Sequence, residues 1–339
     1  MRARPAAGTP PAAGETTGPL VWVLHDGKAG MRSQALGLAE ATGFTLVEKP
    51  LAIRLPWQAL PPQLWPFPRH AVSRRNEHLV PPWPDLVIGC GRNTVLPALA
   101  IRRASGRRCL VAQVQDPHFR RSAFDLLIVP EHDRLRGPRV MASRGAMHRV
   151  TPARLAAERR RFPALMALPR PIVGVLIGGS NKAYRLRLGR IGEIAEAVAA
   201  TLRETGGSAL VTPSRRTGKG GIELLHGRLA GLPAAIWDGA GDNPYFAYLG
   251  LADAFLVTAD SVSMISEAAA TGKPVHILGL DGGNAKFARF HRLMQEAGIT
   301  RPFAGRIEAW SYPVPDDTAR AGATLRALVL GRVGRGAPP

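Results

Sequence analysis

The stretch that most constrains the fold is LVTADSVSMISEAAATGKPVHIL, residues 256–278, which reads as one complete strand–loop–helix–strand unit. Apolar runs at its two ends are typical of parallel strands that are buried on both faces. Between them, Ser261 suits a helix N-cap, three consecutive alanines favour the helix, and Gly272 ends it. A unit of this kind predicts an α/β protein in which helices cover a parallel sheet.

The start of this helix is also a candidate ligand site. Free backbone N–H groups at the start of a helix that follows a parallel strand attract anions, so a phosphate could bind there. A carboxylate one turn further along could then bind a sugar diol. Serine at a helix start often only caps the helix, which is the alternative interpretation. The candidate residues are Ser261, Ser263, Met264 and Glu267.

Three more polar turns follow predicted strands in the second half of the chain. In the first, two glycines would let the backbone approach a phosphate closely, and a lysine could neutralise it. In the second, paired arginines could bind phosphate oxygens in bidentate fashion. Since the carboxyl ends of parallel strands lie along one edge of a sheet, these turns could together hold phosphate, base and ribose. Their residues are Gly178, Gly179, Ser180, Asn181, Lys182, Ser214, Arg215, Arg216, Asn243 and Tyr245.

The first half of the chain repeats the strand–loop–helix pattern, beginning with the apolar run LVWVL at residues 20–24. Polar residues again gather where predicted strands end. His25 is a candidate general base because imidazole titrates near neutrality, and Asp26 and His118 are candidates for the same role. The alternative is that His25 and Asp26 only shape the turn. The turn GCGRNT, residues 89–94, lacks the third glycine of a dinucleotide fingerprint.

Length and composition indicate a globular protein with a sizeable core. The chain has 339 residues, of which 45% are hydrophobic, enough for two domains. No apolar run reaches the ~18 residues of a transmembrane helix, and the first residues lack the apolar region of a secretory signal. Cys90 and Cys109 lie in apolar runs without metal-ligand spacing. We therefore expect a cytoplasmic protein with reduced, buried cysteines.

The net charge of +20 would suit nucleic acid, an anionic membrane surface or a phosphorylated ligand. Only six of the 45 basic residues are lysine, a preference that a GC-rich genome also produces. The arginines are scattered without the aromatic platforms that single-stranded nucleic acid needs, so we expect no nucleic-acid partner. Aromatic residues from Trp57 to Phe67, followed by Arg69, Arg74 and Arg75, could form an interfacial membrane patch or pack onto their own domain.

These patterns predict two Rossmann-like domains that face each other across a cleft. Residues 1–18, rich in Pro, Ala, Gly and Thr, predict a disordered tail. We expect an N-terminal, acceptor-side domain over residues 19–161 and a linker over 162–171. A C-terminal, nucleotide-binding domain is expected over 172–315, followed by a helix and tail over 316–339.

Several motifs together resemble a known family. The segment DNPYFAYLGLADAFLVTADSVSMISEAAATGKPV looks like the donor-nucleotide half of GT-B glycosyltransferases, such as the peptidoglycan N-acetylglucosaminyltransferase. More closely, VWVLHDGKAGMRSQ, VQDPHF, VPEHD, GGSNK, SRRT and NPY together are similar to the mitochondrial-fission family of plants and its bacterial relatives, over about residues 20–310. The resemblance implies a GT-B-like fold, a ribose-binding role for Glu267 and a diphosphate turn at 261–264. It identifies no residue of this sequence as the acceptor-side base. The plant members are described as factors that help recruit a dynamin-like protein to mitochondria.

Two functions follow from this reading. The first is a glycosyltransferase-like enzyme that uses a nucleotide-diphosphate sugar and needs neither a metal nor another cofactor. The sequence lacks an Asp-x-Asp pair, which argues against the metal-dependent alternative fold. The basic turns of this enzyme would stabilise the leaving diphosphate, and His25, Asp26 or His118 would take the proton of an acceptor, which a lipid at the inner face of the membrane could carry. The second is a non-catalytic nucleotide-binding or membrane-associated adaptor. An epimerase of the short-chain dehydrogenase type is discounted, because the sequence lacks a Tyr-x-x-x-Lys pair.

Overall fold

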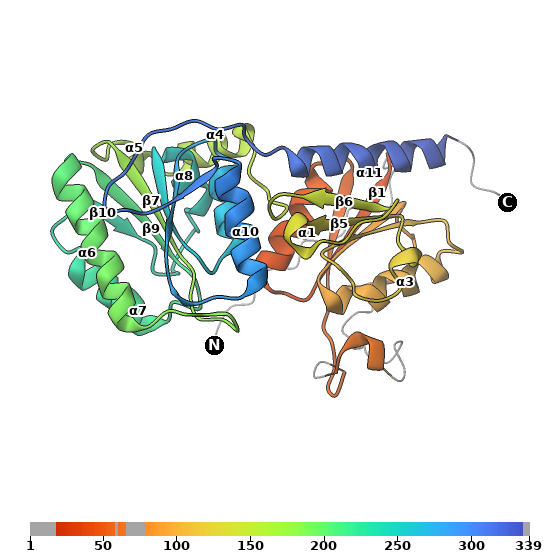
Figure 1. Ribbon diagram of the computed structural model, residues 1–339. Helices are drawn as coiled ribbons and strands as arrows, with labels where there is room; N and C mark the ends of the chain where they lie inside the picture. Colours follow the sequence, from red (N-terminus) through yellow and green to blue (C-terminus); the bar gives the residue numbers. More distant parts are fainter. Residues whose placement is uncertain (1–17, 58–59, 66–78, 335–339) are drawn as a thin grey trace, which may run out of the picture.

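The computed structural model describes residues 18–57, 60–65 and 79–334, which form two α/β units side by side (Figure 1). Each unit is built on a six-stranded sheet whose paired strands are all parallel, so the predicted α/β class with two Rossmann-like domains is confirmed. Most of the expected N-terminal tail, the last five residues and the stretch with Phe67, Arg69, Arg74 and Arg75 lie outside the described residues. No helix in the described part is both long and apolar enough to cross a bilayer.

The N-terminal sheet is buried on both faces, as its continuous apolar strands require. Helices α1 (Ala29–Glu40) and α11 (Asp317–Val333) cover one face, and α3 (Val95–Ala104) covers the other. In sheet order the strands are β2 (Thr45–Pro50), β1 (Leu20–His25), β3 (Leu86–Cys90), β4 (Leu110–Val114), β5 (Leu126–Pro130) and β6 (Val140–Ser143).

The C-terminal sheet is covered in the same way. Helices α6 (Leu188–Thr205) and α7 (Lys219–Arg228) pack on one face. Helices α8 (Tyr245–Leu251), α9 (Val262–Ala269) and α10 (Ala285–Glu296) pack on the other. In sheet order the strands are β10 (Ala234–Ile236), β9 (Ser208–Pro213), β7 (Ile172–Ile177), β11 (Ala254–Thr258), β12 (Val275–Leu278) and β14 (Thr300–Pro302), and a separate pair joins β8 (Tyr184–Arg185) to β13 (Asp281–Gly282).

Both sheets reverse their direction of growth at one point. In the first, the chain builds β2 on one side of β1 and then places β3 on the other side. In the second, β9 and β10 lie on one side of β7, and β11 lies on the other. Ligands of open α/β sheets bind at the carboxyl ends of the strands that flank such a reversal. The two candidate ligand sites, called the first and second locus below, are therefore the carboxyl ends of β1 and β3 and the carboxyl ends of β7 and β11.

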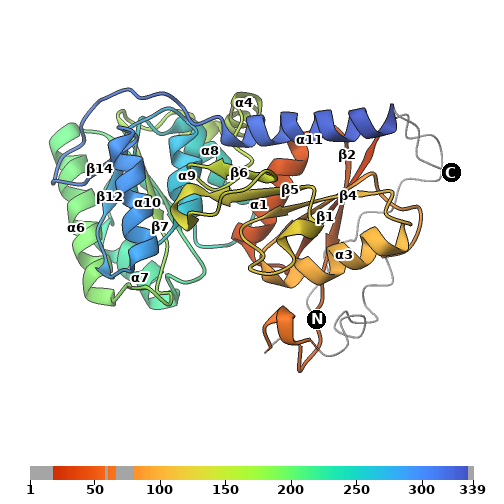
Figure 2. The ribbon, with the colours of Figure 1, turned by 45° about the vertical axis from the view of Figure 1, so that its right-hand side comes forward.

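The chain crosses between the two units twice, whereas the sequence predicts a single linker over residues 162–171. Helix α4 (Pro152–Arg161), expected in the first domain, packs against α8 of the second unit, where a Cβ on Gly250 would lie 3.0 Å from Arg159 Cγ. Helix α11 returns to the first unit and lies along α1 (Figure 2). Its buried Ala321, Leu325 and Val329, spaced four residues apart, complete the apolar layer that α1 begins.

Candidate functional site

A buried carboxylate organises the second of these loci, between β7 and β11. Asp260 follows β11, and its side chain has no exposed surface. Its Oδ2 accepts a hydrogen bond from the backbone N–H of Gly179 at 3.0 Å, and its Oδ1 accepts one from the Thr258 hydroxyl at 2.7 Å. Arg216, from the loop after β9, lies 2.8 Å from Oδ2. The guanidinium predicted to bind phosphate is therefore paired within the protein, where it ties three strand ends together.

The two glycines of this locus are explained by the approach of the protein's own loops. A Cβ on Gly178 would lie 2.2 Å from Oδ1 of Asp260. A Cβ on Gly179 would lie 2.5 Å from Cβ of Arg216. Both distances are far shorter than a non-bonded contact allows, so no larger residue fits at either position without displacing Asp260 or Arg216.

The other polar residues of the predicted turns divide into loop-shaping and free groups. Oδ1 of Asn181 accepts the N–H groups of Ala183 and Tyr184, and Ser214 donates to the carbonyl of Gly178. The remaining turn residues that shape loops are Ser180, which accepts the Leu186 N–H, and Asn243, which accepts the Tyr245 N–H. Two basic residues of these turns, Lys182 and Arg215, are exposed and form no ion pair with any described residue.

Helix α9 begins against the N-terminal unit. Oγ of Ser261 accepts the Met264 N–H at 3.3 Å, so this serine caps the helix. A Cβ on Gly30, in the first turn of α1, would lie 3.5 Å from Oγ of Ser263. Helix α1 has no side-chain cap of its own. The positive ends of two helix dipoles thus meet at the junction of the units, which favours an anion at this point.

Glu267 lies one turn into α9 and is only 6% exposed. Its Oε1 accepts a hydrogen bond from the hydroxyl of Ser33, on α1, at 3.0 Å. Its Oε2 accepts one from the hydroxyl of Tyr245, at the start of α8, at 2.6 Å. Burial raises the pKa of Glu267, and the two hydroxyl donors and Arg149 only partly oppose that rise. Burial likewise raises the pKa of Tyr245 well above its usual value.

The face of α9 that carries Glu267 is a polar contact between the units. Ser263, Ser266 and Glu267 are spaced at i, i+3 and i+4 and therefore share one side of the helix. Oγ of Ser266 accepts the N–H of Ala146 at 2.9 Å, and a Cβ on Gly145 would lie 2.6 Å from that oxygen. Figure 2 shows α9 on the side of its unit that faces α1 and β6.

A second set of polar contacts joins the units beside α10. Nζ of Lys286 lies 2.7 Å from Oδ1 of Asp133, in the turn after β5. Nε of Arg289 donates to the carbonyl of His132 at 3.0 Å. The imidazole of His132 is buried there and packs edge-on against Phe290.

His25 stands at the first locus, at the end of β1, and is fully engaged within the protein. Its Nε2 lies 2.7 Å from Oε1 of Glu48, and its Nδ1 accepts the N–H of Gly27 at 3.1 Å. Glu48 also accepts the guanidinium of Arg32, which lowers the pKa of that carboxyl. With 2% of its surface exposed and both ring nitrogens bonded, His25 fixes the loop that follows β1.

Asp26 lies at the carboxyl edge of the first sheet and is also engaged within the protein. Its Oδ2 accepts the side-chain N–H of Asn93 at 3.0 Å, so it bridges the ends of β1 and β3, and it pairs with Lys28. Burial alone would raise the pKa of Asp26, but the hydrogen bonds and charge of Lys28 outweigh it, and the pKa lies below its usual value. His118, after β4, is 71% exposed and lies 3.3 Å from Asp116.

Sequence reasoning missed three residues that hold these loci together. Asp260 could have been found, because it lies three residues after a predicted strand and directly precedes a capping serine. Asn93 stands in the GCGRNT turn, whose pattern indicates only an incomplete dinucleotide fingerprint. Ser33 gives no local signal, since it lies 234 residues from Glu267 in sequence. Among the described residues, no group of three His, Cys, Asp or Glu side chains could hold a metal ion.

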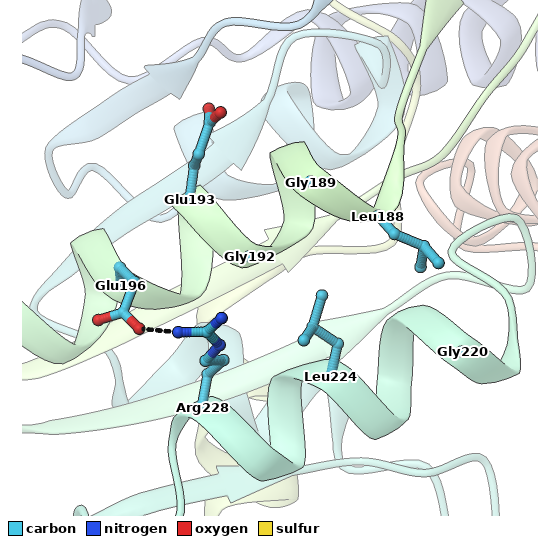
Figure 3. A pocket seen from close by; sticks show the side chains of 8 residues that line it. All are labelled: Leu188, Gly189, Gly192, Glu193, Glu196, Gly220, Leu224 and Arg228. Atoms are coloured by element: carbon cyan, nitrogen blue, oxygen red, sulfur yellow. Dashed lines mark hydrogen bonds and ion pairs between the residues drawn. The ribbon is translucent and has the colours of Figure 1, made fainter.

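A groove of about 870 Å³ lies elsewhere, between α6 and α7 (Figure 3). Glu196 and Arg228 bridge it with an ion pair of 2.7 Å, and Leu188 and Leu224 stand at its other end. Because α6 and α7 cover the face of the sheet opposite to α9, none of the predicted site residues lines this groove. Its size alone does not make it the functional site.

Comparison with known proteins places the chain in a family. The family described as "Mitochondrial fission ELM1" matches residues 29–329. The chain belongs to this ELM1 family. It is 35% identical over 277 residues to the mitochondrial fission protein ELM1 of Arabidopsis thaliana, covering 74% of the chain and 65% of the plant protein, so it spans about two thirds of that relative. It is 26% identical over 344 residues to the uncharacterized protein RP120 of Rickettsia prowazekii (strain Madrid E), covering 86% and 93% of the two chains.

The fold of this ELM1-family chain is GT-B-like, as the resemblance implied. The solved UDP-GlcNAc 2-epimerase of Methanocaldococcus jannaschii superposes with a TM-score of 0.55, covering 92% of this chain and 99% of that one. The two sequences are 14% identical, a level at which the likeness shows the fold alone. Both the family and the two-unit architecture were therefore predicted correctly.

Proposed function

We propose that this ELM1-family chain binds a nucleotide-diphosphate sugar at the carboxyl edge of its C-terminal sheet and acts on it as a glycosyltransferase-like enzyme. The observation that carries the proposal is the Glu267 carboxylate, which lies one turn beyond a helix start and accepts a hydroxyl on each oxygen. A ribose offers the same pair of hydroxyl donors. These features support a diol-binding role for Glu267 next to an anion site.

The diphosphate would bind at the start of α9, in the turn from Ser261 to Met264. The N-terminus of α9 lies there, and the exposed Lys182 and Arg215 supply charges that no described carboxylate neutralises. Arg216 contributes indirectly, because its pair with Asp260 fixes the Gly178–Gly179 backbone. These groups would stabilise the negative charge that builds on a leaving diphosphate without a metal ion.

The acceptor would bind in the N-terminal unit, beside Asp26. This carboxylate stands at the sheet reversal, where Asn93 and Lys28 bind it. Despite its burial, their hydrogen bonds and the charge of Lys28 lower its pKa, so an acceptor that displaces Lys28 would make it a stronger base. His25 has both ring nitrogens bonded within the protein. His118 is exposed and offers a second base. An acceptor carried by a lipid, at an anionic membrane surface, would agree with the net charge of +20.

The second candidate function is a non-catalytic nucleotide-binding or membrane-associated adaptor. The observation that favours it is that Glu267, Arg216 and His25 all find partners within the chain. Such a site would bind a nucleotide and leave it unchanged.

The test is thermal unfolding with UDP, GDP, ADP, CDP and UDP-GlcNAc, for the wild type and for a Lys182→Ala/Arg215→Ala variant. A ligand at ~100 times its dissociation constant stabilises the fold by about 2.7 kcal/mol. We expect one nucleotide class to raise the melting temperature, and the double variant to lose much of that shift. The control, Lys219→Ala/Arg228→Ala, removes two exposed cations of α7 and should keep it.

Turnover separates the two candidate functions. If the chain is an enzyme, the wild type, given a membrane lipid extract as the source of acceptor, should transfer the glycosyl group to an acceptor hydroxyl or to water and release nucleoside diphosphate, and Asp26→Asn should do so much more slowly. Binding without release by the wild type would favour the adaptor. No stabilisation by any of these nucleotides would refute both proposals for this site.

A further inference from the structure

On the basis of the proposed nucleotide site, we infer that the two units close over that site. Ser33 then acts as a latch on Glu267, and a nucleotide must open the molecule to bind. The carboxylate that would hold a ribose is in contact with the opposite unit. Two hydroxyls of the protein occupy the places of the two hydroxyls of the sugar.

The two hydroxyls that bind Glu267 belong to different units of the protein. Tyr245 belongs to the same unit as Glu267, and its start-of-helix position in α8 holds the hydroxyl 2.6 Å from Oε2. Ser33 belongs to α1 of the other unit, and its hydroxyl reaches Oε1 from across the junction at 3.0 Å. Movement of one unit relative to the other withdraws Ser33 and leaves Tyr245 in place. Tyr245 is thus a positioning residue, and Ser33 is the latch.

The phosphate end of the site is covered by the same contact. Gly30, in the first turn of α1, lies against Ser263, and the Gly145–Ala146 backbone lies against Ser266. Gly145 is required by this approach, because its Cβ would lie 2.6 Å from the Ser266 oxygen, whereas a Cβ on Gly30 would make an ordinary contact of 3.5 Å with Ser263. The start of α1 therefore lies against the turn where the diphosphate would bind, and a ribose on Oε1 of Glu267 would have to displace the Ser33 hydroxyl. A bound nucleotide sugar and the closed arrangement would therefore exclude each other.

The contacts between the units include an exposed ion pair and several hydrogen bonds beside the packing of His132 on Phe290. Lys286, which pairs with Asp133, is 53% exposed, and exposed ion pairs contribute little. Polar contacts of this kind between domains usually permit relative motion. Glu267 itself is held in the closed state with a raised pKa, because burial disfavours its charge. Opening relieves that penalty and exposes the carboxylate for a ribose.

Because opening and nucleotide binding are coupled, Ser33→Ala should strengthen nucleotide binding, whereas the loss of a residue that binds the nucleotide would weaken it. If the nucleotide binds only the open state, its apparent affinity is reduced by the fraction of molecules that are closed. Ser33→Ala removes the hydroxyl donor and leaves Oε1 of Glu267 buried without it, so the closed state loses stability. We expect Ser33→Ala to bind the stabilising nucleotide about tenfold more tightly than the wild type, the effect of one hydrogen bond to a charged group.

The experiment measures affinity by calorimetry and the separation of the units by paired spin labels. Labels at Arg136→Cys and Glu204→Cys, both exposed, report the two units, and the native Cys90 and Cys109 are buried. Ser33→Thr restores a hydroxyl and should return both readouts toward the wild type. Ser122→Ala, an exposed serine of the same unit, is the matched control.

Each outcome decides a stated part of the inference. Longer label distances in Ser33→Ala, and in the wild type on adding nucleotide, together with tighter binding by Ser33→Ala, would support it. Unchanged distances in Ser33→Ala would overturn the latch, whatever binds. Nucleotide binding that leaves the wild-type distance unchanged or shortens it would overturn the competition. Opening in Ser33→Ala without binding of any nucleotide by any variant would refute the proposed function and leave the latch standing.

Discussion

Replacing Asp260 by alanine should destabilise the C-terminal unit strongly. The carboxylate is fully buried and accepts the Gly179 N–H, the Thr258 hydroxyl and the Arg216 guanidinium. A buried N–H that loses its acceptor costs about 1–3 kcal/mol, and the lost hydroxyl contact adds about 1 kcal/mol. The ion pair adds little, because Arg216 is 42% exposed, and removing a buried charge returns part of its desolvation cost. We expect a net loss of about 2–4 kcal/mol.

The assay is urea unfolding followed by circular dichroism, in which the midpoint should fall without a change in the slope. Asp242→Ala is the matched control, because Asp242 forms an arginine pair of similar length, 2.7 Å to Arg161, but is 77% exposed. Loss of that pair should cost less than about 1 kcal/mol. Equal losses in the two variants would refute the argument that burial, and not the ion pair, makes Asp260 important.

Two further predictions concern Gly178 and His132. Gly178→Ala should cost about 1–3 kcal/mol, because its Cβ would lie 2.2 Å from Oδ1 of Asp260. The same change should cost less in an Asp260→Ala background, and equal costs in urea unfolding would disprove the clash. Burial lowers the pKa of His132 from 6.5 to about 4, so below pH 6.5 the unfolded chain binds a proton that the folded chain does not. Stability should therefore fall as the pH drops from 6.5 toward 4, and should fall less in His132→Phe; an identical pH dependence would contradict this.

The sequence predicted the parts of this protein that depend on neighbouring residues. Continuous apolar runs marked the buried strands, and the short polar segments after them marked the carboxyl edges of both sheets. Ser261 caps α9 as the pattern indicated, and Glu267 follows one turn later. The short pair β8–β13 and strand β14 were not predicted, since each spans only two or three residues and carries no period of its own.

Only the tertiary structure decided how the candidate residues are used. Arg216 was equally suited by sequence to a phosphate or to an aspartate, and the approach of the β9 loop to Asp260 settled its partner. Glu267 carried the mark of a ribose site, yet its two oxygens are held by Tyr245 and Ser33, the second of which lies 234 residues away. The propensities of strands, caps and turns act over a few residues and can be read along the chain. Which side chains meet is determined by the packing of two sheets and their helices, which no local pattern encodes.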